Sequence, residues 1–215
     1  TLLFTSSISG EGKTFVSMNM ASVFALMGKK TILIGLDLRK PRIAQDFGLT
    51  NDKGMSTALS SNSSWRDVVK ASGYENLDVI LSGPIPPNPA ELLLQEKFGK
   101  IVQEIKKEYD VVVFDCPPVG LVSETKELFA FADVSFYVFR QGYSMKGNTQ
   151  ILNNLVEKGG ITKIYGIFND IHMDKGYGYG YGYGYGYGYG YGGNSYGYHE
   201  EIQLPWWKRA LRRKS

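Results

Sequence analysis

Residues 2–15 read LLFTSSISGEGKTF, and this stretch decides the fold class. Its apolar start is typical of a buried strand, and the residues from Thr14 onward are typical of a helix. Between them, Gly10 and Gly12 let backbone amides approach a phosphate, and the positive end of the following helix favours an anion. Lys13 would neutralise the outer phosphates, and the Thr14 hydroxyl would ligate magnesium. The stretch therefore predicts a phosphate-binding loop that holds ATP and Mg²⁺.

The alternative interpretation is a glycine-rich strand-to-helix turn that binds nothing. Ser7 stands where the usual pattern has its first glycine, which weakens the bare match. The placement between a strand and a helix favours the nucleotide site. The predicted contacts to nucleotide within the loop are Ser9, Gly10, Glu11, Gly12, Lys13, Thr14 and Phe15.

Outward from the loop, apolar runs alternate with amphipathic stretches. The predicted strands are Leu2–Thr5, Thr31–Leu36, Leu77–Leu81, Val111–Phe114, Val134–Phe139 and Ile164–Phe168. The predicted helices are Thr14–Met27, Ala90–Glu108, Glu124–Phe131 and Met145–Glu157, with Asn88 as the cap and Pro89 at the first position of the second helix. Continuous apolar strands separated by helices predict an α/β fold, a P-loop NTPase-type parallel sheet flanked by helices on both faces.

Two aspartates follow predicted strands. Asp115 comes after VVVF, and Asp37 lies at the end of the strand that follows the first helix. Because parallel strands end at one edge of a sheet, both carboxylates should lie beside the phosphate-binding loop. There they could hold magnesium, and Asp37 could accept a hydroxyl proton. Lys13, Asp37 and Asp115 are the predicted catalytic residues, and Thr14, Asp37 and Asp115 the predicted metal ligands. The alternatives are a turn residue at Asp115 and a surface ion pair of Asp37 with Arg39 or Lys40.

Size and composition limit the function classes. The 215 residues suit one domain with an appendage, and a net charge of +3 is too small to indicate nucleic-acid binding. The single cysteine, Cys116, excludes an internal disulfide and is interpreted as a packing residue in a reducing compartment. The sequence contains no run of eighteen apolar residues, the length that would indicate a membrane span. We expect a soluble fragment of a longer protein that works on the cytoplasmic side of the inner membrane.

A tyrosine-rich tail follows the expected domain, which we place at residues 1–175. In residues 176–198, ten tyrosines and eleven glycines fill 21 of 23 positions. The glycines raise the entropic cost of ordering, so we expect a flexible tail. The other tyrosines, Tyr74, Tyr109, Tyr137, Tyr143 and Tyr165, are interpreted as core or surface residues. The predicted phosphoacceptors are Tyr177, Tyr179, Tyr181, Tyr183, Tyr185, Tyr187, Tyr189, Tyr191, Tyr196 and Tyr198. The alternative is a low-complexity sticker whose tyrosines associate without chemistry.

Residues 199–215 form a third segment that combines Trp206 and Trp207 with five lysines and arginines in the last eight residues. Such a composition suits an anionic membrane surface. A solvated tail end is the alternative.

Several stretches resemble the bacterial tyrosine kinases that regulate capsule and exopolysaccharide production. They are SSISGEGKT, LDLRKP, LSGPIPPNPAELL, VVVFDCPP, GIFND and the tyrosine tail, and the resemblance covers nearly the whole chain. It implies that ATP phosphorylates the tail of a neighbouring subunit within a ring-like homo-oligomer. It also implies an upstream membrane activator segment. Asn169, in GIFND, stands where related ATPases contact adenine.

The chain departs from this family at one position of its D-x-D-x-R segment, where Gly35 replaces the first aspartate. That replacement leaves the identity of the catalytic base open, with Asp37 as the candidate. The runner-up function is a nucleotide-switched partition-type ATPase, which Ile8 disfavours because such ATPases carry a lysine there. The third is a nucleotide-binding scaffold without tyrosine transfer.

Overall fold

The computed structural model describes residues 1–122 and 125–172. Within them, seven strands form one sheet in the order β3-β4-β2-β5-β1-β6-β7. The strands are β1 (Leu2–Ser6), β2 (Thr31–Gly35), β3 (Val69–Ala71), β4 (Leu77–Ile80), β5 (Val111–Asp115), β6 (Val134–Arg140) and β7 (Ile164–Asn169). The predicted parallel pairing is confirmed for all of them except the short edge strand β3, which was not predicted and pairs antiparallel with β4.

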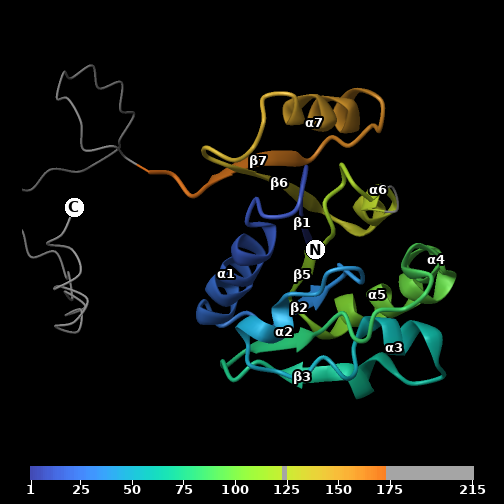
Figure 1. Cartoon of the computed structure of the whole chain (residues 1–215). Coiled ribbons are helices and arrows are strands. Elements are labelled where there is room, and N and C mark those ends of the chain that lie inside the picture. Colours follow the sequence, from blue (N-terminus) through green and yellow to red (C-terminus); the bar gives the residue numbers. More distant parts are fainter. Residues whose placement is uncertain (123–124, 173–215) are drawn as a thin grey trace, which may run out of the picture. The chain divides into compact units, whose positions relative to one another are not determined.

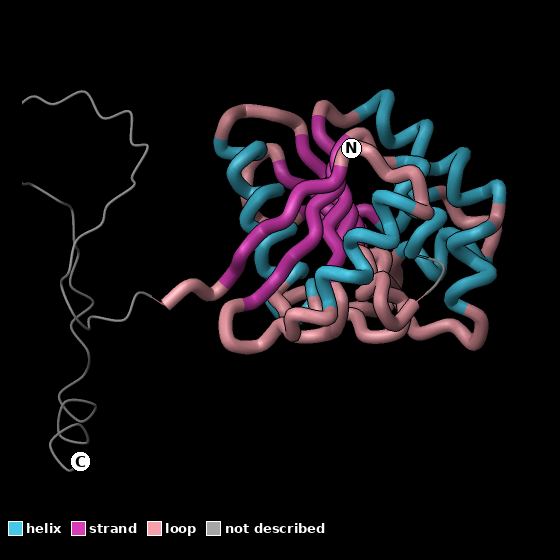
Figure 2. Tube along the Cα trace, turned by 90° about the horizontal axis from the view of Figure 1, so that it is seen from above, coloured by secondary structure: helices cyan, strands magenta, loops and turns pink. Residues whose placement is uncertain are grey.

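Helices cover both faces of the sheet, as predicted (Figure 1). One core cluster lies between the sheet and helices α1 (Lys13–Leu26) and α2 (Ile43–Asp46). The other contains residues of α3 (Met55–Ser60), η1 (Trp65–Val68), α4 (Pro89–Leu94), α5 (Glu96–Glu108), α6 (Thr125–Leu128), η2 (Phe129–Phe131) and α7 (Asn148–Glu157). Seen from above, the twisted strands run between these two sets of helices (Figure 2). This two-sided burial explains why the central strands are apolar at nearly every position.

Some predicted helices differ from the observed ones. The single helix expected over Ala90–Glu108 is wrong, because the chain turns extended at Gln95 (ψ 145°) and divides it into α4 and α5. Pro89 does occupy the first turn, but Asn88 makes no capping bond to the backbone. Its side-chain amide instead donates to Glu91 Oε2 at 2.7 Å. The helix expected from Glu124 begins at Thr125 among the described residues and tightens into η2.

The order of the strands positions the site. β1 lies between β5 and β6, so the chain leaves β1 at the point where the strand order reverses. Ligands of open α/β sheets bind outside the carboxyl ends of the strands at such a point.

No helix within the described ranges is long and apolar enough to span a bilayer. The predictions for residues 176–215, including every phosphoacceptor tyrosine and the basic aromatic segment, lie outside the described residues, as does the proposed domain boundary at residue 175.

Candidate nucleotide site

The loop between β1 and α1 has the backbone geometry of an anion-binding turn. Gly10 and Gly12 adopt φ values of 92° and 95°, in the left-handed region that side chains disfavour. Gly12 is also crowded, because a Cβ there would lie 2.0 Å from Asn169 Nδ2. The N-cap residue of α1 is Gly12, which has no side chain, so no side chain at that position accepts a hydrogen bond from the first amides of the helix. We call residues 7–14 the P-loop from here on.

All four of the predicted catalytic and metal-binding side chains meet at the end of the P-loop. Lys13 Nζ lies 3.3 Å from Asp37 Oδ2 and 3.5 Å from Asp115 Oδ1. The Thr14 hydroxyl donates to Asp115 Oδ2 at 2.8 Å. The side chains of Lys13, Asp37 and Asp115 are only 9, 8 and 3% exposed. This burial argues against the alternative in which Asp37 forms a surface ion pair.

Burial and charge act in opposite directions on the groups of this cluster. Burial lowers the pKa of Lys13, but the negative charges of Asp115 and Asp37 outweigh it and raise that pKa above its usual value. Lys13 is therefore a fixed cation at neutral pH. For Asp115, burial dominates and raises the carboxyl pKa, while Lys13 and the Thr14 hydroxyl oppose that shift. The carboxylate of Asp115 thus depends on nearby positive charge to stay ionised.

The oxygen atoms of the cluster fit a hard divalent cation. Asp115 Oδ1 is buried and accepts no hydrogen bond, although Lys13 Nζ lies near it. Thr14 Oγ1 and the Asp37 carboxylate supply further oxygens, the ligand type that Mg²⁺ prefers. Within residues 1–122 and 125–172, no three His, Cys, Asp or Glu side chains gather into a metal site. Such a pair of carboxylates suits a metal whose other ligands are phosphates and water.

A cavity of about 310 Å³ opens beside this cluster. It is lined by Ser9, Gly10, Gly12, Lys13, Thr14, Asp37, Lys40, Arg42 and Asp46. Of these, Lys40, Arg42 and Asp46 were not predicted as site residues, although Lys40 lies in the segment LDLRKP and the other two follow it. Two predicted contacts, Glu11 and Phe15, do not line this cavity; the Glu11 side chain is fully buried and Phe15 is 64% exposed on α1, and their contacts with nucleotide stay predictions. The Asn169 side chain reaches the P-loop, and its contact with adenine stays a prediction.

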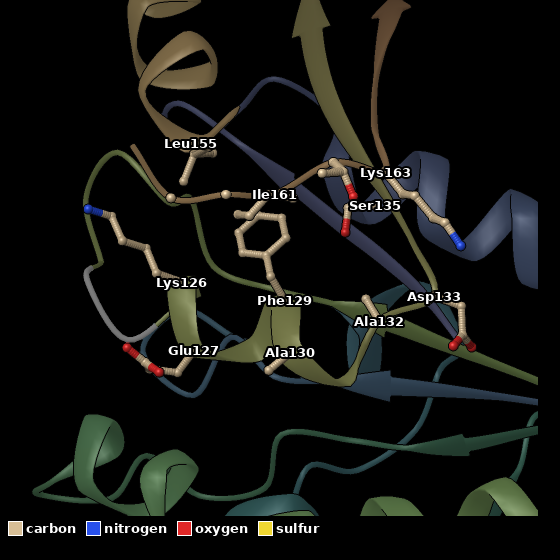
Figure 3. Close-up of a pocket in the computed structure, with 13 residues that line it drawn as sticks. Lys126, Glu127, Phe129, Ala130, Ala132, Asp133, Ser135, Leu155, Ile161 and Lys163 are labelled. Carbon is tan, nitrogen blue, oxygen red and sulfur yellow. The ribbon is translucent and has the colours of Figure 1, made fainter. Parts of the chain in front are cut away.

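A larger cavity, of about 650 Å³, lies at the other end of the sheet (Figure 3). It is bordered by Ser135 at the start of β6, Lys163 just before β7, and the apolar side chains of Phe129, Leu155 and Ile161. β6 and β7 run parallel to β1, so their first residues lie at the opposite edge of the sheet from the P-loop, which follows the carboxyl end of β1. The cavity is therefore remote from the carboxyl edge. It is therefore not the nucleotide site.

The space beside Gly35 is already filled. A Cβ at Gly35 would lie 2.9 Å from Ser82 Oγ and 3.1 Å from Ile43 Cδ1. Ser82 also donates to the Gly35 carbonyl at 3.1 Å. An aspartate in this position would displace both neighbours.

Cys116, next to the site, is fully buried, and burial raises its thiol pKa well above the usual value, which agrees with a packing role.

The glycine-rich loop between β1 and α1, its lysine, and the two strand-end aspartates on a parallel sheet define a P-loop NTPase domain. A family model described as an AAA domain matches residues 4–163. The chain is 43% identical over 145 residues to tyrosine-protein kinase YwqD of Bacillus subtilis, a match that covers 67% of this chain and 61% of YwqD. It is 33% identical over 174 residues to the putative tyrosine-protein kinase CapB of Staphylococcus aureus, covering 81% and 76%.

Among solved structures, the kinase domain of the Escherichia coli tyrosine kinase ETK superposes with a TM-score of 0.77 at 30% identity, covering 86% of this chain and 72% of that one. The chain belongs to the bacterial tyrosine kinase family, whose members are protein-tyrosine kinases. It spans about three fifths of the length of YwqD.

Proposed function

We propose that this chain is a catalytic domain that transfers the γ-phosphoryl group of ATP to tyrosines in the Gly-Tyr tail of a neighbouring copy. The observation that carries the proposal is the buried cluster of Lys13, Asp37 and Asp115 at the end of the P-loop. Buried charges are costly to maintain, and this cluster stands where phosphates would bind. The ten tyrosines of residues 176–198 provide acceptors in the same chain.

The roles follow from the positions of the groups. P-loop amides and the Lys13 ammonium would bind the phosphates and offset their charge. Asp115, Thr14 and Asp37 would hold Mg²⁺, which when bound neutralises charge that develops on the transferred phosphoryl group. Asp37 lines the cavity beside the P-loop, so it is our candidate to accept the proton of the acceptor hydroxyl, whereas Gly35 has no side chain that could do so.

The cellular setting is part of the same proposal. The relatives include CapB, and a solved chimeric protein, CapA2B2, superposes with a TM-score of 0.73 at 30% identity. We include in the proposal a role in capsule or exopolysaccharide production, a ring-like homo-oligomer, and activation by a membrane-bound partner segment at the cytoplasmic face of the membrane, all of which the sequence resemblance to the family implies. The basic aromatic residues 199–215 would add contact with anionic lipid.

The test is mass spectrometry of the purified chain after incubation with Mg-ATP, with Lys13→Met as the control. We expect mass increases of one or more phosphoryl groups, located in residues 176–198, in the parent but not in Lys13→Met. Mixing a Lys13→Met chain with a tail-deleted active chain then separates transfer between copies from transfer within one. Nucleotide binding without any increment, in the presence of an activator segment, would favour the switch ATPase or the scaffold.

A further inference from the structure

Three consecutive carbonyl groups of the P-loop accept hydrogen bonds from side chains outside the loop. The donors come from the end of β6, the turn that follows it, and the end of β7. The bonds run from Tyr143 Oη to Ser9 O (3.0 Å), from Arg140 Nη1 to Gly10 O (3.1 Å) and from Asn169 Nδ2 to Glu11 O (3.2 Å). We call Arg140, Tyr143 and Asn169 the carbonyl clamp.

The clamp acts on the face of the loop that a phosphate does not touch. The N–H and C=O groups of a peptide unit point in opposite directions, so a carbonyl held outward leaves the neighbouring amide facing inward. Successive inward amides form the concave anion site of a phosphate-binding loop. A carbonyl that turned inward would instead present a negative dipole to the phosphates. Holding these carbonyls therefore favours phosphate binding without any contact to the ligand.

The glycines of the loop allow the clamp to come close. A Cβ at Gly10 would lie 2.8 Å from Tyr143 Oη, and one at Gly12 would lie 2.0 Å from Asn169 Nδ2. The absence of side chains at these two positions thus serves the outer face of the loop as well as the phosphate face. The clamp residues also support one another, since the Arg140 guanidinium lies 5.4 Å from the centre of the Tyr143 ring.

A second attachment fixes the loop from within. The buried Glu11 carboxylate accepts the Ile8 amide at 2.9 Å through Oε2, and the Ser144 hydroxyl through Oε1. Ser144 follows the clamp residue Tyr143, so one short segment holds both the backbone and a side chain of the loop. Arg140 is itself held by Asp170, whose Oδ2 accepts from Arg140 Nε at 2.9 Å.

We propose that Arg140, Tyr143 and Asn169 are positioning residues that keep the P-loop in its phosphate-binding conformation before nucleotide arrives. The inference rests on the proposed function only in taking a nucleotide phosphate as the ligand. Preorganisation of this kind increases affinity by removing the cost of ordering the loop on binding. Loss of one clamp bond should weaken nucleotide binding about 3- to 10-fold, with Tyr143 at the lower end because its side chain is 46% exposed.

The first experiment needs no nucleotide. Amide hydrogen exchange of the peptide that covers residues 7–15 is measured in the full chain and in Tyr143→Phe and Arg140→Gln variants. Tyr74→Phe and Arg66→Gln are the matched controls, since both residues are exposed and away from the P-loop. We expect exchange about 3- to 10-fold faster in the clamp variants and unchanged in the controls. Parent-like exchange in both clamp variants would overturn the inference.

The second experiment titrates the same variants with a fluorescent ATP analogue and Mg²⁺. We expect a higher Kd with a Tm close to that of the parent, and partial recovery in Arg140→Lys, which keeps one donor for Gly10 O. A lower Tm with an unchanged Kd would mean a merely structural role and would also overturn the inference. If the parent itself fails to bind, the proposed function fails, whereas the exchange measurement still decides the clamp.

Discussion

This molecule contains two clusters in which one cationic side chain contacts two carboxylates, and one cluster is buried while the other is exposed. In the buried cluster, Lys13 lies between Asp37 and Asp115. In the exposed cluster, Arg66 of η1 contacts Glu104 and Glu108 of α5, with side chains 52, 50 and 37% exposed. The exposed cluster also has a hydrogen bond from the Trp65 indole to Glu104 at 2.8 Å. The distance from Arg66 Nη1 to Glu104 Oε2, 3.4 Å, is similar to the 3.3 and 3.5 Å of the buried cluster.

The difference between them is hydration. Water and salt screen the exposed charges, and pairs of that kind contribute little to stability. The buried charges have lost their hydrating water, so each depends on its partners for stabilisation. Replacing all three charged side chains with well-packed apolar ones would often leave a protein no less stable. A buried cluster that is costly to keep therefore indicates a function, while the exposed one needs none. Four changes test this comparison.

The largest effect should come from Lys13→Met, which leaves two adjacent carboxylates buried without their cation. We expect no detectable tyrosine phosphorylation and a loss of roughly 3–5 kcal/mol in the free energy of unfolding at pH 7. The loss should shrink as the pH falls, because protonation of the carboxylates relieves the repulsion and Asp115 has a raised pKa. Urea unfolding at several pH values measures it. A pH-independent loss would contradict this account.

Next in size is Asp37→Asn, which removes the proposed proton acceptor while keeping the shape of the side chain. We expect phosphoryl transfer to fall about 100-fold or more, with nucleotide still bound. Steady-state phosphorylation of the tail measures this change. Asp52→Asn, at an exposed aspartate paired with Lys70, is the matched control and should retain parent activity. Full activity in Asp37→Asn would remove this residue from the catalytic assignment.

A third change restores the aspartate that the family pattern carries and this chain lacks. Gly35→Asp should lower the free energy of unfolding by about 1–3 kcal/mol without raising activity, because Ser82 and Ile43 fill the space. Gly147→Asp, where a Cβ would meet open space, is the control and should be close to neutral. Both are compared by urea unfolding. Higher activity at parent stability would mean that the site accommodates a third carboxylate.

The smallest effect is expected for Arg66→Gln in the exposed cluster. Its Tm should stay within about 2 °C of the parent, and the difference should vanish in high salt. Thermal unfolding at low and high ionic strength checks this. A large, salt-independent loss would show that the two clusters do not differ in the way that hydration predicts.

Much of the candidate site could be predicted because it rests on local patterns. The strand-loop-helix pattern around Lys13 and the strand-end positions of Asp37 and Asp115 follow from the periodicity of nearby residues and one rule about parallel sheets. The same rule, applied to the strand that ends at Arg140, would have drawn attention to the segment Arg140–Ser144. Tyr143 was instead interpreted as a core or surface residue, since nothing local in the sequence shows that its hydroxyl reaches Ser9.

Other features depended on partners distant in the sequence. The three residues of β3 are too few for a clear pattern, and they form a strand only because the edge of β4 is available. The break at Gln95 is equally hidden, because the residues around it have good helix propensity and packing decides where α4 ends.

By itself, the sequence determined the α/β class, the phosphate-binding loop and its lysine, because hydrophobic periodicity and glycine placement act over a few neighbouring residues. Only the tertiary structure decided which groups are buried together. It placed the three charges of Lys13, Asp37 and Asp115 out of water, filled the space beside Gly35, and brought Arg140, Tyr143 and Asn169 to the back of the P-loop. These contacts join residues from different strands and loops, and they arise only when the sheet assembles.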